Sequence, residues 1–291
     1  MIFSVASFWQ HVPENIDPVV FSIGSFSLYW YAVFFLLGWA VAVGILFSRV
    51  AKKEIILGKQ VLWDIALVSL TSAIIGGRLG YAVFYDQSLL SRPSLLVSPF
   101  SESGAFVGIR GMSFHGALLG AFLGLGMIAR REKIKLLPLL DFVVVVAPVA
   151  LFFGRIGNFV NLELFGRVTD VPWGVYAPSE TVLRHPSQLY EAGAEGLLLF
   201  LILYSLRKKA FPEGVLAGLF LLLYGIFRFS IEFVRERDPG VSSGIEALSM
   251  GQVLSLGMIA ASIGLFLWIF SRKNGMMHLK RTFMSSLEKN A

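Results

Sequence analysis

The chain of 291 residues contains no cysteine and few charged residues. The absence of cysteine excludes disulfide bonds, thiolate metal sites and catalysis by a cysteine nucleophile of the chain itself. Charged residues make up only 15% of the chain, whereas a soluble domain averages about 25%. Hydrophobic residues make up 56%, and the mean hydropathy is +0.72. This balance is typical of a protein that crosses a membrane several times.

The chain also lacks the common signatures of nucleotide and metal sites. It contains no Walker A motif, no HExxH and no cluster of aspartates. No apolar segment carries a lysine that could form a retinal-type Schiff base. We therefore expect neither a cofactor nor a metal ion. The net charge of +6 does not indicate a nucleic-acid partner, because the basic residues follow a membrane topology.

Seven segments are long and apolar enough to cross a hydrocarbon core of about 30 Å. Of the 25 basic residues, 16 follow the first, third, fifth and seventh of these segments, and they include every lysine. Short basic loops stay on the cytoplasmic side. The sequence thus predicts an all-α integral membrane protein with seven transmembrane helices, its N-terminus outside and its C-terminus in the cytoplasm. The predicted spans are 28–47, 61–85, 113–129, 137–157, 187–206, 215–234 and 249–270.

This topology divides the chain into three parts. Residues 1–27 are too broken to span and are predicted to lie at the outer interface, 28–270 form the membrane body, and 271–291 form a basic cytoplasmic tail. Two outer connections, 86–112 and 158–186, are rich in Ser, Pro and Gly and predict small arms over the outer leaflet.

Every basic residue outside the cytoplasmic set is an arginine. The planar guanidinium group can bind phosphate or carboxylate through two parallel hydrogen bonds, which lysine cannot do. Arginine also reaches membrane interfaces well, so this bias has a second explanation without a ligand. The nine residues are Arg78, Arg92, Arg110, Arg155, Arg167, Arg184, Arg228, Arg235 and Arg237.

Polar residues within the predicted spans gather near the outer ends. Charged groups inside a membrane are costly and usually functional. The cytoplasmic halves are nearly all Leu, Val, Phe and Ala, which disfavours a polar path across the membrane. We therefore predict a site at lipid level in the outer third of the membrane. Its candidate residues are Tyr31, Arg78, His115, Arg155, Asn158, His185, Gln188, Glu191, Arg228, Glu232 and Gln252.

The sixth predicted span carries the sharpest local pattern. Tyr224, Arg228, Glu232 and Arg235 recur at helical spacing and share one face. Arg228 and Glu232 could neutralise each other as a structural pair. Two further arginines at similar depth, however, leave three cations for one glutamate. We therefore predict that a phospholipid phosphate supplies the missing negative charge.

Other residues of this region can be explained by structural roles as well as by functional ones. A histidine such as His115 or His185 is more often a structural hydrogen-bonding group than a base. Ser113 does not face His115, because residues two apart point in different directions on a helix. The glycines at 116, 120 and 124 predict a helix-packing face.

The stretch GRIGNFVNLELFGR at 154–167 is unusually polar for the end of a span. We expect Arg155 to face the phosphate. Asn158 and Asn161 could bond polar groups of the lipid headgroup or the loop backbone. Glu163 is either catalytic or pairs with Arg167 to brace the turn.

Six ordered motifs resemble those of bacterial prolipoprotein diacylglyceryl transferases. The resemblance extends from about residue 17 to residue 270, with Leu162 standing where glycine is common. Besides GRIGNFVNLELFGR, the motifs are GGRLGY at 76–81, RGMSFHGALLG at 110–120, RHPSQLYE at 184–191, YGIFRFSIEFVR at 224–235 and SMGQ at 249–252.

The resemblance implies transfer of the diacylglyceryl group of phosphatidylglycerol to the lipobox cysteine of a prolipoprotein signal peptide, with release of glycerol 1-phosphate. It implies a multi-pass enzyme of the bacterial inner membrane whose active site faces the periplasmic leaflet. Arg155 and Arg228 would be the essential arginines. Further residues given a role by the resemblance are Tyr31, His115, Asn158, Glu163, Gly166, Glu232 and Arg235.

This reaction suits the residues. Arginines would stabilise the charge that develops on the leaving phosphate. The substrate thiol, with a pKa of about 8.5, needs a base, for which His115 is the first candidate and Glu232 the second. The expected catalytic residues are thus Arg155, Arg228, His115 and Glu232. The expected substrate-binding residues are Tyr31, Arg78, Asn158, Asn161, Glu163, Gly166, His185, Tyr224 and Arg235.

Two other functions fit parts of the pattern. A transporter or flippase of an anionic lipid or solute would also place arginines at membrane depth, but it should carry polar groups towards both faces. An intramembrane protease would need a serine or an aspartate pair at depth. Only Asp64 and Asp141 qualify as such a pair, and both lie nearer the cytoplasmic ends.

Overall fold

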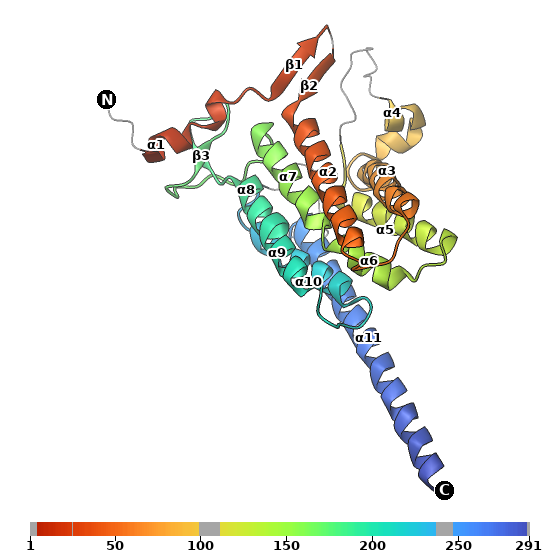
Figure 1. Ribbon diagram of the computed structural model, residues 1–291. Coiled ribbons are helices and arrows are strands. Elements are labelled where there is room, and N and C mark those ends of the chain that lie inside the picture. Colours follow the sequence, from red (N-terminus) through yellow and green to blue (C-terminus); the bar gives the residue numbers. More distant parts are fainter. Residues whose placement is uncertain (1–4, 25, 99–110, 237–246, 290–291) are drawn as a thin grey trace.

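The chain folds into a helical bundle with small β-structures at one end, as a computed structural model shows (Figure 1). The structure describes residues 5–24, 26–98, 111–236 and 247–289. The helices are α1 (Val5–Gln10), α2 (Trp30–Ala51), α3 (Lys59–Phe84), α4 (Pro93–Val97), α5 (Phe114–Arg131), α6 (Leu136–Val144), α7 (Ala147–Val160), α8 (Ser187–Glu191), α9 (Leu199–Leu206), α10 (Val215–Ile231) and α11 (Met250–Lys289). The other elements are the 3-10 helices η1 (Pro13–Asn15) and η2 (Gln87–Ser91), the π-helix η3 (Ala192–Leu198) and the strands β1 (Val19–Ile23), β2 (Phe26–Tyr29), β3 (Val175–Tyr176) and β4 (Leu183–Arg184).

Four helical segments of the described chain are long and apolar enough to cross a membrane, and the bent pair α6–α7 makes a fifth. The chain is therefore a mostly helical membrane protein. All seven predicted spans coincide with helices, but α5 and α10 have only 18 and 17 residues. The four unbroken candidate spans are Trp30–Ala51, Lys59–Phe84, Ser187–Leu206 and Met250–Arg272.

A sharp bend of 41° separates α6 from α7 within the fourth predicted span. Pro148 lies in the first turn of α7. Proline has no N–H group to donate and its ring clashes with the preceding turn, so a continuous helix cannot pass through it. The bend sets the direction of α7, which carries Arg155.

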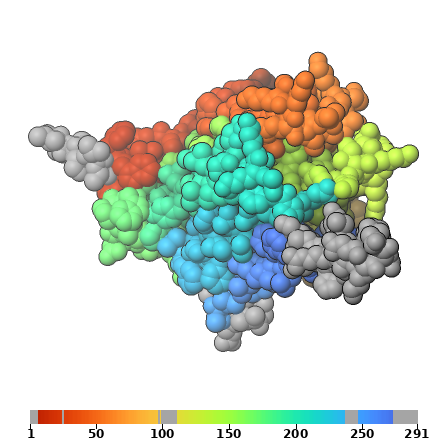
Figure 2. Space-filling view, turned by 60° about the horizontal axis from the view of Figure 1, so that its bottom comes forward, coloured from red at the N-terminus to blue at the C-terminus, as the bar shows by residue number. Residues whose placement is uncertain are grey.

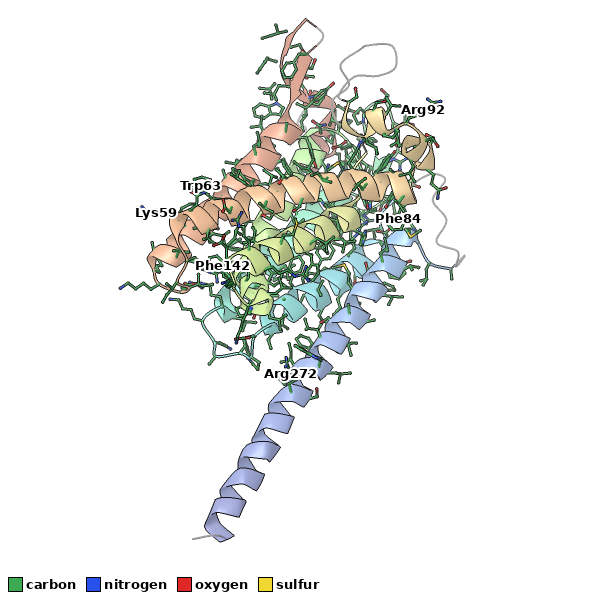
Figure 3. The ribbon with its side chains drawn as sticks, turned by 90° about the vertical axis from the view of Figure 1, so that its right-hand side faces the viewer. Lys59, Trp63, Phe84, Arg92, Phe142 and Arg272 are labelled. Atoms are coloured by element: carbon green, nitrogen blue, oxygen red, sulfur yellow. The ribbon has the colours of Figure 1, made fainter. Side chains whose placement is uncertain are left out.

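The glycines of α5 pack against those of α3, as the sequence predicted. A Cβ atom added at Gly80 would lie 2.7 Å from the Cα of Gly116, so no larger residue fits without moving a backbone. Figure 3 shows α3 along the side of the bundle, from Lys59 at one end to Phe84 at the other. In the same view α11 continues past Arg272 and away from the bundle.

The strands are additions that the sequence analysis did not predict. Strands β1 and β2 form an antiparallel hairpin directly before α2, and we call this end of the molecule the hairpin end. Its turn contains Gly24 at φ +60°, a conformation that L side chains rarely adopt. The short pair β3–β4 belongs to the predicted arm 158–186.

The N-terminal helix α1 lies beside β3, and Figure 2 shows the red segment that contains α1 against the green segment that contains β3. The indole nitrogen of Trp9 donates to the carbonyl of Trp173 at 2.9 Å, and the rings of His11 and Tyr176 stack with centroids 4.7 Å apart. The other predicted arm, 86–112, contains η2 and α4, but its residues 99–110, with Arg110, lie outside the described residues. Arg237 lies outside them too.

Candidate functional site

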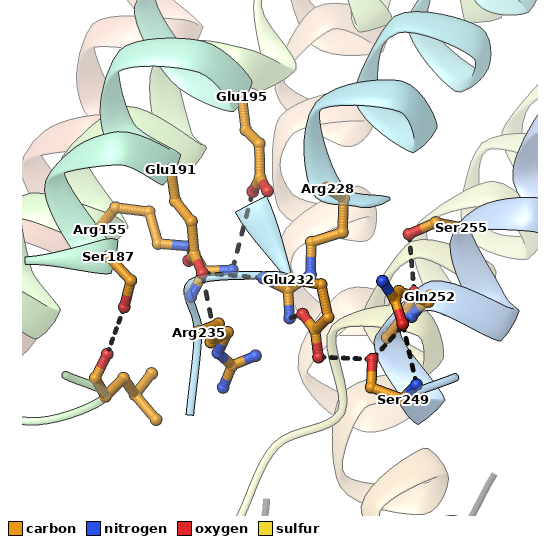
Figure 4. A network of polar contacts seen from close by, with 12 residues as sticks. Arg155, Ser187, Glu191, Glu195, Arg228, Glu232, Arg235, Ser249, Gln252 and Ser255 are labelled. Carbon is orange, nitrogen blue, oxygen red and sulfur yellow. Dashed lines mark hydrogen bonds and ion pairs between the residues drawn. The ribbon is translucent and has the colours of Figure 1, made fainter. Parts of the chain in front are cut away.

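The carboxylate of Glu191 binds two arginines from different helices at the hairpin end (Figure 4). Arg155 of α7 places its Nε 2.6 Å from Glu191 Oε2, and Arg228 of α10 places its Nη1 2.8 Å from Glu191 Oε1. A third arginine, Arg235, has its Nε 3.8 Å from Oε1 of the same group. Glu191 is only 2% exposed, so water screens these attractions little.

Two further glutamates complete this group. Arg228 uses its Nη2 to bind Glu232 Oε2 at 2.9 Å, and Glu195 Oε2 lies 3.8 Å from Arg155 Nη2. The predicted Arg228–Glu232 pair is therefore present, but it is one part of a larger network. We call the six residues the arginine–glutamate cluster: Arg155, Arg228, Arg235, Glu191, Glu195 and Glu232.

The cluster corrects the charge count made from the sequence. The sequence sets three arginines against Glu232 alone, and this deficit predicts a phosphate as the missing negative charge. In the structure, three glutamates face three arginines. Arg78, counted in the deficit, donates to the carbonyls of Leu95, Leu96 and Gly111 at 2.7 to 3.1 Å. An external anion therefore does not follow from charge balance.

The SMGQ motif braces Glu232. The hydroxyl of Ser249 donates to Glu232 Oε1 at 2.9 Å, and the same hydroxyl accepts from the backbone N–H of Gln252 at 3.1 Å (Figure 4). A Cβ atom at Gly251 would lie 2.7 Å from the Glu232 carboxylate, so a larger residue there would displace that carboxylate. This motif thus positions a glutamate rather than touching the arginines itself.

The stretch 154–167 folds into a turn beside the cluster. The amide of Asn158 donates to Glu163 Oε1 at 2.8 Å, and Asn161 Oδ1 accepts from the backbone N–H of Tyr31 at 3.4 Å. The alternative in which Glu163 pairs with Arg167 is wrong for the described residues, because Arg167 Nε donates instead to the carbonyl of Arg235 at 3.0 Å. The turn thereby connects the start of α2 to the segment that carries Arg235.

Gly166 lies where this turn meets two other segments. Its N–H donates to the carbonyl of His185 at 2.8 Å, and its backbone pairs with that of Arg235 as an isolated bridge. A Cβ atom there would meet the carbonyl of Val234 and would lie 2.9 Å from the Cβ of His185. Gly166 is therefore required for close packing of this turn.

The two histidines differ in their surroundings. His115, near the start of α5, has a buried Nε2 with no hydrogen-bond partner among the described residues. Ser113 accepts from the N–H of Gly116 at 3.3 Å as the helix cap, so it is not a nucleophile paired with His115. His185 Nδ1 lies 3.2 Å from the hydroxyl of Tyr190. Burial lowers the pKa of His185, which the charge of Asp170 opposes.

The two tyrosines among the expected residues differ in their burial. Tyr224 is buried one turn before Arg228, and its ring stacks on Phe114 with centroids 4.9 Å apart. Tyr31 is 37% exposed, and its ring stacks on Phe35 with centroids 6.3 Å apart. Tyr224 thus lies between Phe114, which precedes His115, and Arg228 of the cluster. Tyr31 lies partly exposed on α2.

Sequence reasoning missed the part played by two glutamates. The sequence pattern places Glu191 among the polar residues near the outer ends of the spans without indicating a role, and it does not single out Glu195. Their signal was available, because two acidic residues four apart in an otherwise apolar helix share one face and imply buried cations nearby. The π-helix that holds Glu195 had no such signal in the sequence.

Residues 18–268 match the family described as prolipoprotein diacylglyceryl transferase. A protein of Chlorobaculum tepidum with the name phosphatidylglycerol–prolipoprotein diacylglyceryl transferase is 41% identical over 268 residues, which cover 90% of this chain and 93% of the relative. A protein of the same name from Pseudoalteromonas translucida is 42% identical over 258 residues, covering 88% and 94%. By this match over most of its length, the chain belongs to the prolipoprotein diacylglyceryl transferase family.

Proposed function

We propose that this enzyme transfers the diacylglyceryl group of phosphatidylglycerol to the lipobox cysteine thiol of a prolipoprotein, forming a thioether and releasing glycerol 1-phosphate. The relatives' name states the lipid donor and the protein acceptor. The observation that carries the proposal is the pair Arg155 and Arg228, held together on one buried carboxylate. The absence of cysteine agrees, since the reacting sulfur belongs to the substrate.

The cluster suits the stabilisation of a phosphate leaving group. In the reaction, the thiolate sulfur attacks the terminal glycerol carbon, the carbon–oxygen bond to the phosphate breaks, and the electron pair stays on the phosphate oxygen. The new negative charge lies close to the guanidinium groups of Arg155 and Arg228. Preorganised donors of this kind contribute about 10²- to 10³-fold each to the rate. Glu191 would orient both arginines before the lipid binds.

His115 is the base that the contacts favour. Glu232 already binds Arg228 Nη2 and accepts a hydrogen bond from the hydroxyl of Ser249, both at 2.9 Å, so each of its oxygens already has a partner. The buried Nε2 of His115 has no partner among the described residues and so keeps a free position for a substrate proton. We assign the thiol proton to this nitrogen.

The remaining expected residues would bind the two substrates around the cluster. Asn158, Asn161 and Glu163 form the turn beside Arg155 and would meet the glycerol headgroup. Tyr31, on the outer surface of α2, would contact the lipid. Arg78, Gly166, His185 and Tyr224 support the walls of this site through the contacts described above.

In this proposal the chain crosses the bacterial inner membrane seven times, with its N-terminus in the periplasm. The support is the charge distribution: the lysine-rich loops join the helix ends opposite the hairpin end. The cluster would then lie in the periplasmic leaflet, where the signal peptide and the lipid headgroup can both reach it.

The contacts of Asp141 and Asp64 argue against a protease, and the apolar interior of α10 argues against a transporter. Asp141 Oδ1 and Oδ2 accept from the N–H groups of Ala217 and Gly214 at 2.8 and 2.6 Å, and Asp64 pairs with Arg131. Neither aspartate is therefore placed as a protease residue. For a transporter, buried Leu216 and Phe220 lie between the capped start of α10 and the cluster, so that helix offers no polar path.

The purified full chain tests the proposal directly. It is mixed with phosphatidylglycerol vesicles and a lipobox peptide, and mass spectrometry measures a diacylglyceryl adduct on the cysteine. A peptide with serine in place of that cysteine and vesicles of phosphatidylethanolamine are the matched controls. An adduct only with cysteine and phosphatidylglycerol is expected. Folded protein that produces none would overturn the proposal.

A further inference from the structure

Glu195 is the least satisfied carboxylate of the cluster. It is 0% exposed, and neither of its oxygens has a hydrogen-bond partner among the described residues. Its one ion pair, with Arg155 Nη2, is long at 3.8 Å. A buried ionised carboxylate without donors is costly, so its position needs an explanation.

The position is a built feature of the helix. Glu195 lies within η3, a π-helical turn between α8 and α9. Gly196 in the same turn packs on Phe152 of α7, where an added Cβ would lie 2.6 Å from the Phe152 Cβ. Single π-helical turns are rare and occur often at functional sites. This turn brings Glu195 towards Arg155 on α7 (Figure 4).

Three of the elements packed against η3, namely α7, α8 and α10, present titratable or charged groups to this region. Helix α7 contributes Arg155, α8 contributes Glu191, and α10 contributes Tyr224 and Arg228, with Arg235 beyond its end. His115 of α5 lies within the electrostatic reach of Arg228. Only Arg155 forms an ion pair with Glu195 among the described residues.

The charges of the cluster cancel, with three arginines and three glutamates. A phosphodiester headgroup adds one negative charge to this buried place. Neutrality is regained if one carboxylate takes up a proton. Glu191 and Glu232 bind arginines at 2.6 to 2.9 Å, whereas Glu195 has only its 3.8 Å pair. Glu195 is therefore the carboxylate that is cheapest to neutralise.

We propose, on the basis of the proposed function, that Glu195 takes up one proton from water when the phosphate of the lipid headgroup binds Arg155. The proton returns to water when the phosphate leaves. No covalent bond to the lipid changes in this step. Glu195 is thus a positioning residue that acts through Arg155: it balances this arginine without the lipid and releases the Nη2 donor to the phosphate.

The proposal has a quantitative consequence. If one proton enters with each lipid, the dissociation constant of the lipid rises by up to about tenfold per pH unit once Glu195 is ionised in the free protein. The phosphodiester itself stays a monoanion over this range, so it adds no dependence. Replacement by glutamine mimics the protonated acid and removes the dependence.

Calorimetry of the full chain in detergent tests this prediction. A short-chain phosphatidylglycerol is titrated in two buffers with different ionisation enthalpies, which measures the protons taken up per lipid. The wild type and His115→Gln are expected to take up close to one proton at alkaline pH, and Glu195→Gln none. Glu213→Gln, an exposed glutamate paired with Lys135, is the matched control and should behave as the wild type.

The outcomes separate the two proposals. Zero proton uptake by a wild type that binds the lipid and forms the peptide adduct would overturn the role of Glu195 alone, even if the glutamine variant failed to fold. Uptake that disappears in His115→Gln and persists in Glu195→Gln would assign the proton to the histidine instead. A wild type that neither binds the lipid nor forms the adduct would remove the proposed function and this inference with it.

Discussion

Arg155 and Arg228 lie on helices far apart in the sequence, yet they bind the two oxygens of one carboxylate, that of Glu191. The carboxylate fixes the distance between the two guanidinium groups. Two cations held so close would repel each other strongly in a buried place without it. The predictions below test what this arrangement does for activity and for stability.

Replacing Arg228 by lysine keeps the charge and removes the fork of donors. Arg228 now uses Nη1 for Glu191 and Nη2 for Glu232, and a lysine ammonium cannot reach both with the same geometry. We expect kcat/KM for adduct formation to fall by about 100-fold or more. Arg131→Lys, at an exposed arginine paired with Asp64, is the control and should keep normal turnover. Near wild-type rates for Arg228→Lys would refute the clamp.

Glu191→Gln removes the charge that joins the two arginines. Breaking a buried ion pair by removing one partner costs about 3–5 kcal/mol, because the other charges stay buried. We expect a clear drop in Tm, measured by thermal unfolding in detergent, together with loss of activity. Glu213→Gln breaks an exposed pair worth less than about 1 kcal/mol and is the comparison. Equal Tm values for both variants would show that Glu191 is not the centre of the network.

Gly166→Ala and Gly154→Ala compare a crowded glycine with an uncrowded one in the stretch 154–167. The Cβ at position 166 would meet the carbonyl of Val234 and the side chain of His185, whereas at 154 nothing lies within 4 Å. We expect the first variant to lose activity because the segment of Arg235 is displaced. Gly154→Ala should be stable or gain up to about 1 kcal/mol from helix propensity. Similar activity in both variants would contradict the packing argument.

His115→Gln tests the base. If the Nε2 of His115 accepts the thiol proton, the acid limb of the kcat/KM profile belongs to this histidine, and the variant should lose that limb with most of its rate. The measurement is adduct formation against pH for both proteins with the same lipobox peptide. A profile of unchanged shape would mean that His115 is not the base.

Glu54 gives a pH effect at the end of the bundle opposite the hairpin. Burial acts to raise its pKa, but hydrogen bonds and charges from Arg49 and Arg207 outweigh it and hold the pKa of Glu54 below its ordinary value. A depressed pKa stabilises the fold above the unfolded value, about 4.3, and this stabilisation is lost as the pH falls through the lower folded value. Tm should therefore drop less on acidification for Glu54→Gln than for the wild type. Parallel Tm curves would contradict this role.

The sequence predicted most of the local structure and the family. Apolar length located all seven helical segments, because a membrane span must be continuous and apolar. Helical spacing predicted the Arg228–Glu232 pair, since that contact lies within one turn. It did not place Arg235 correctly, because α10 ends at Ile231 and Arg235 pairs with the backbone of Gly166 and reaches the cluster through Glu191. The motifs around Arg155 and Arg228 pointed to the transferase family that the comparisons show.

The sequence could not predict which side chains of different helices pair with each other. Only Glu232 lies near the arginines in the sequence pattern. The four-residue spacing of Glu191 and Glu195 indicates buried cations nearby, but it does not say that these glutamates face α7 and α10. The sequence paired Glu163 with the nearby Arg167, although each finds a different partner. The hairpin β1–β2 also escaped, since its short strands have no buried face to impose alternation.

One physical reason explains why the sequence determined some features of this protein and the tertiary structure decided others. Span length, helix faces and motif residues depend on the chain within a few turns, so the sequence by itself determined the helical segments, the choice of arginine and the family. Charge balance in a buried site depends on which side chains meet through space. Only the tertiary structure, through the bend before α7 and the π-helical turn at Glu195, decided that three arginines find three glutamates.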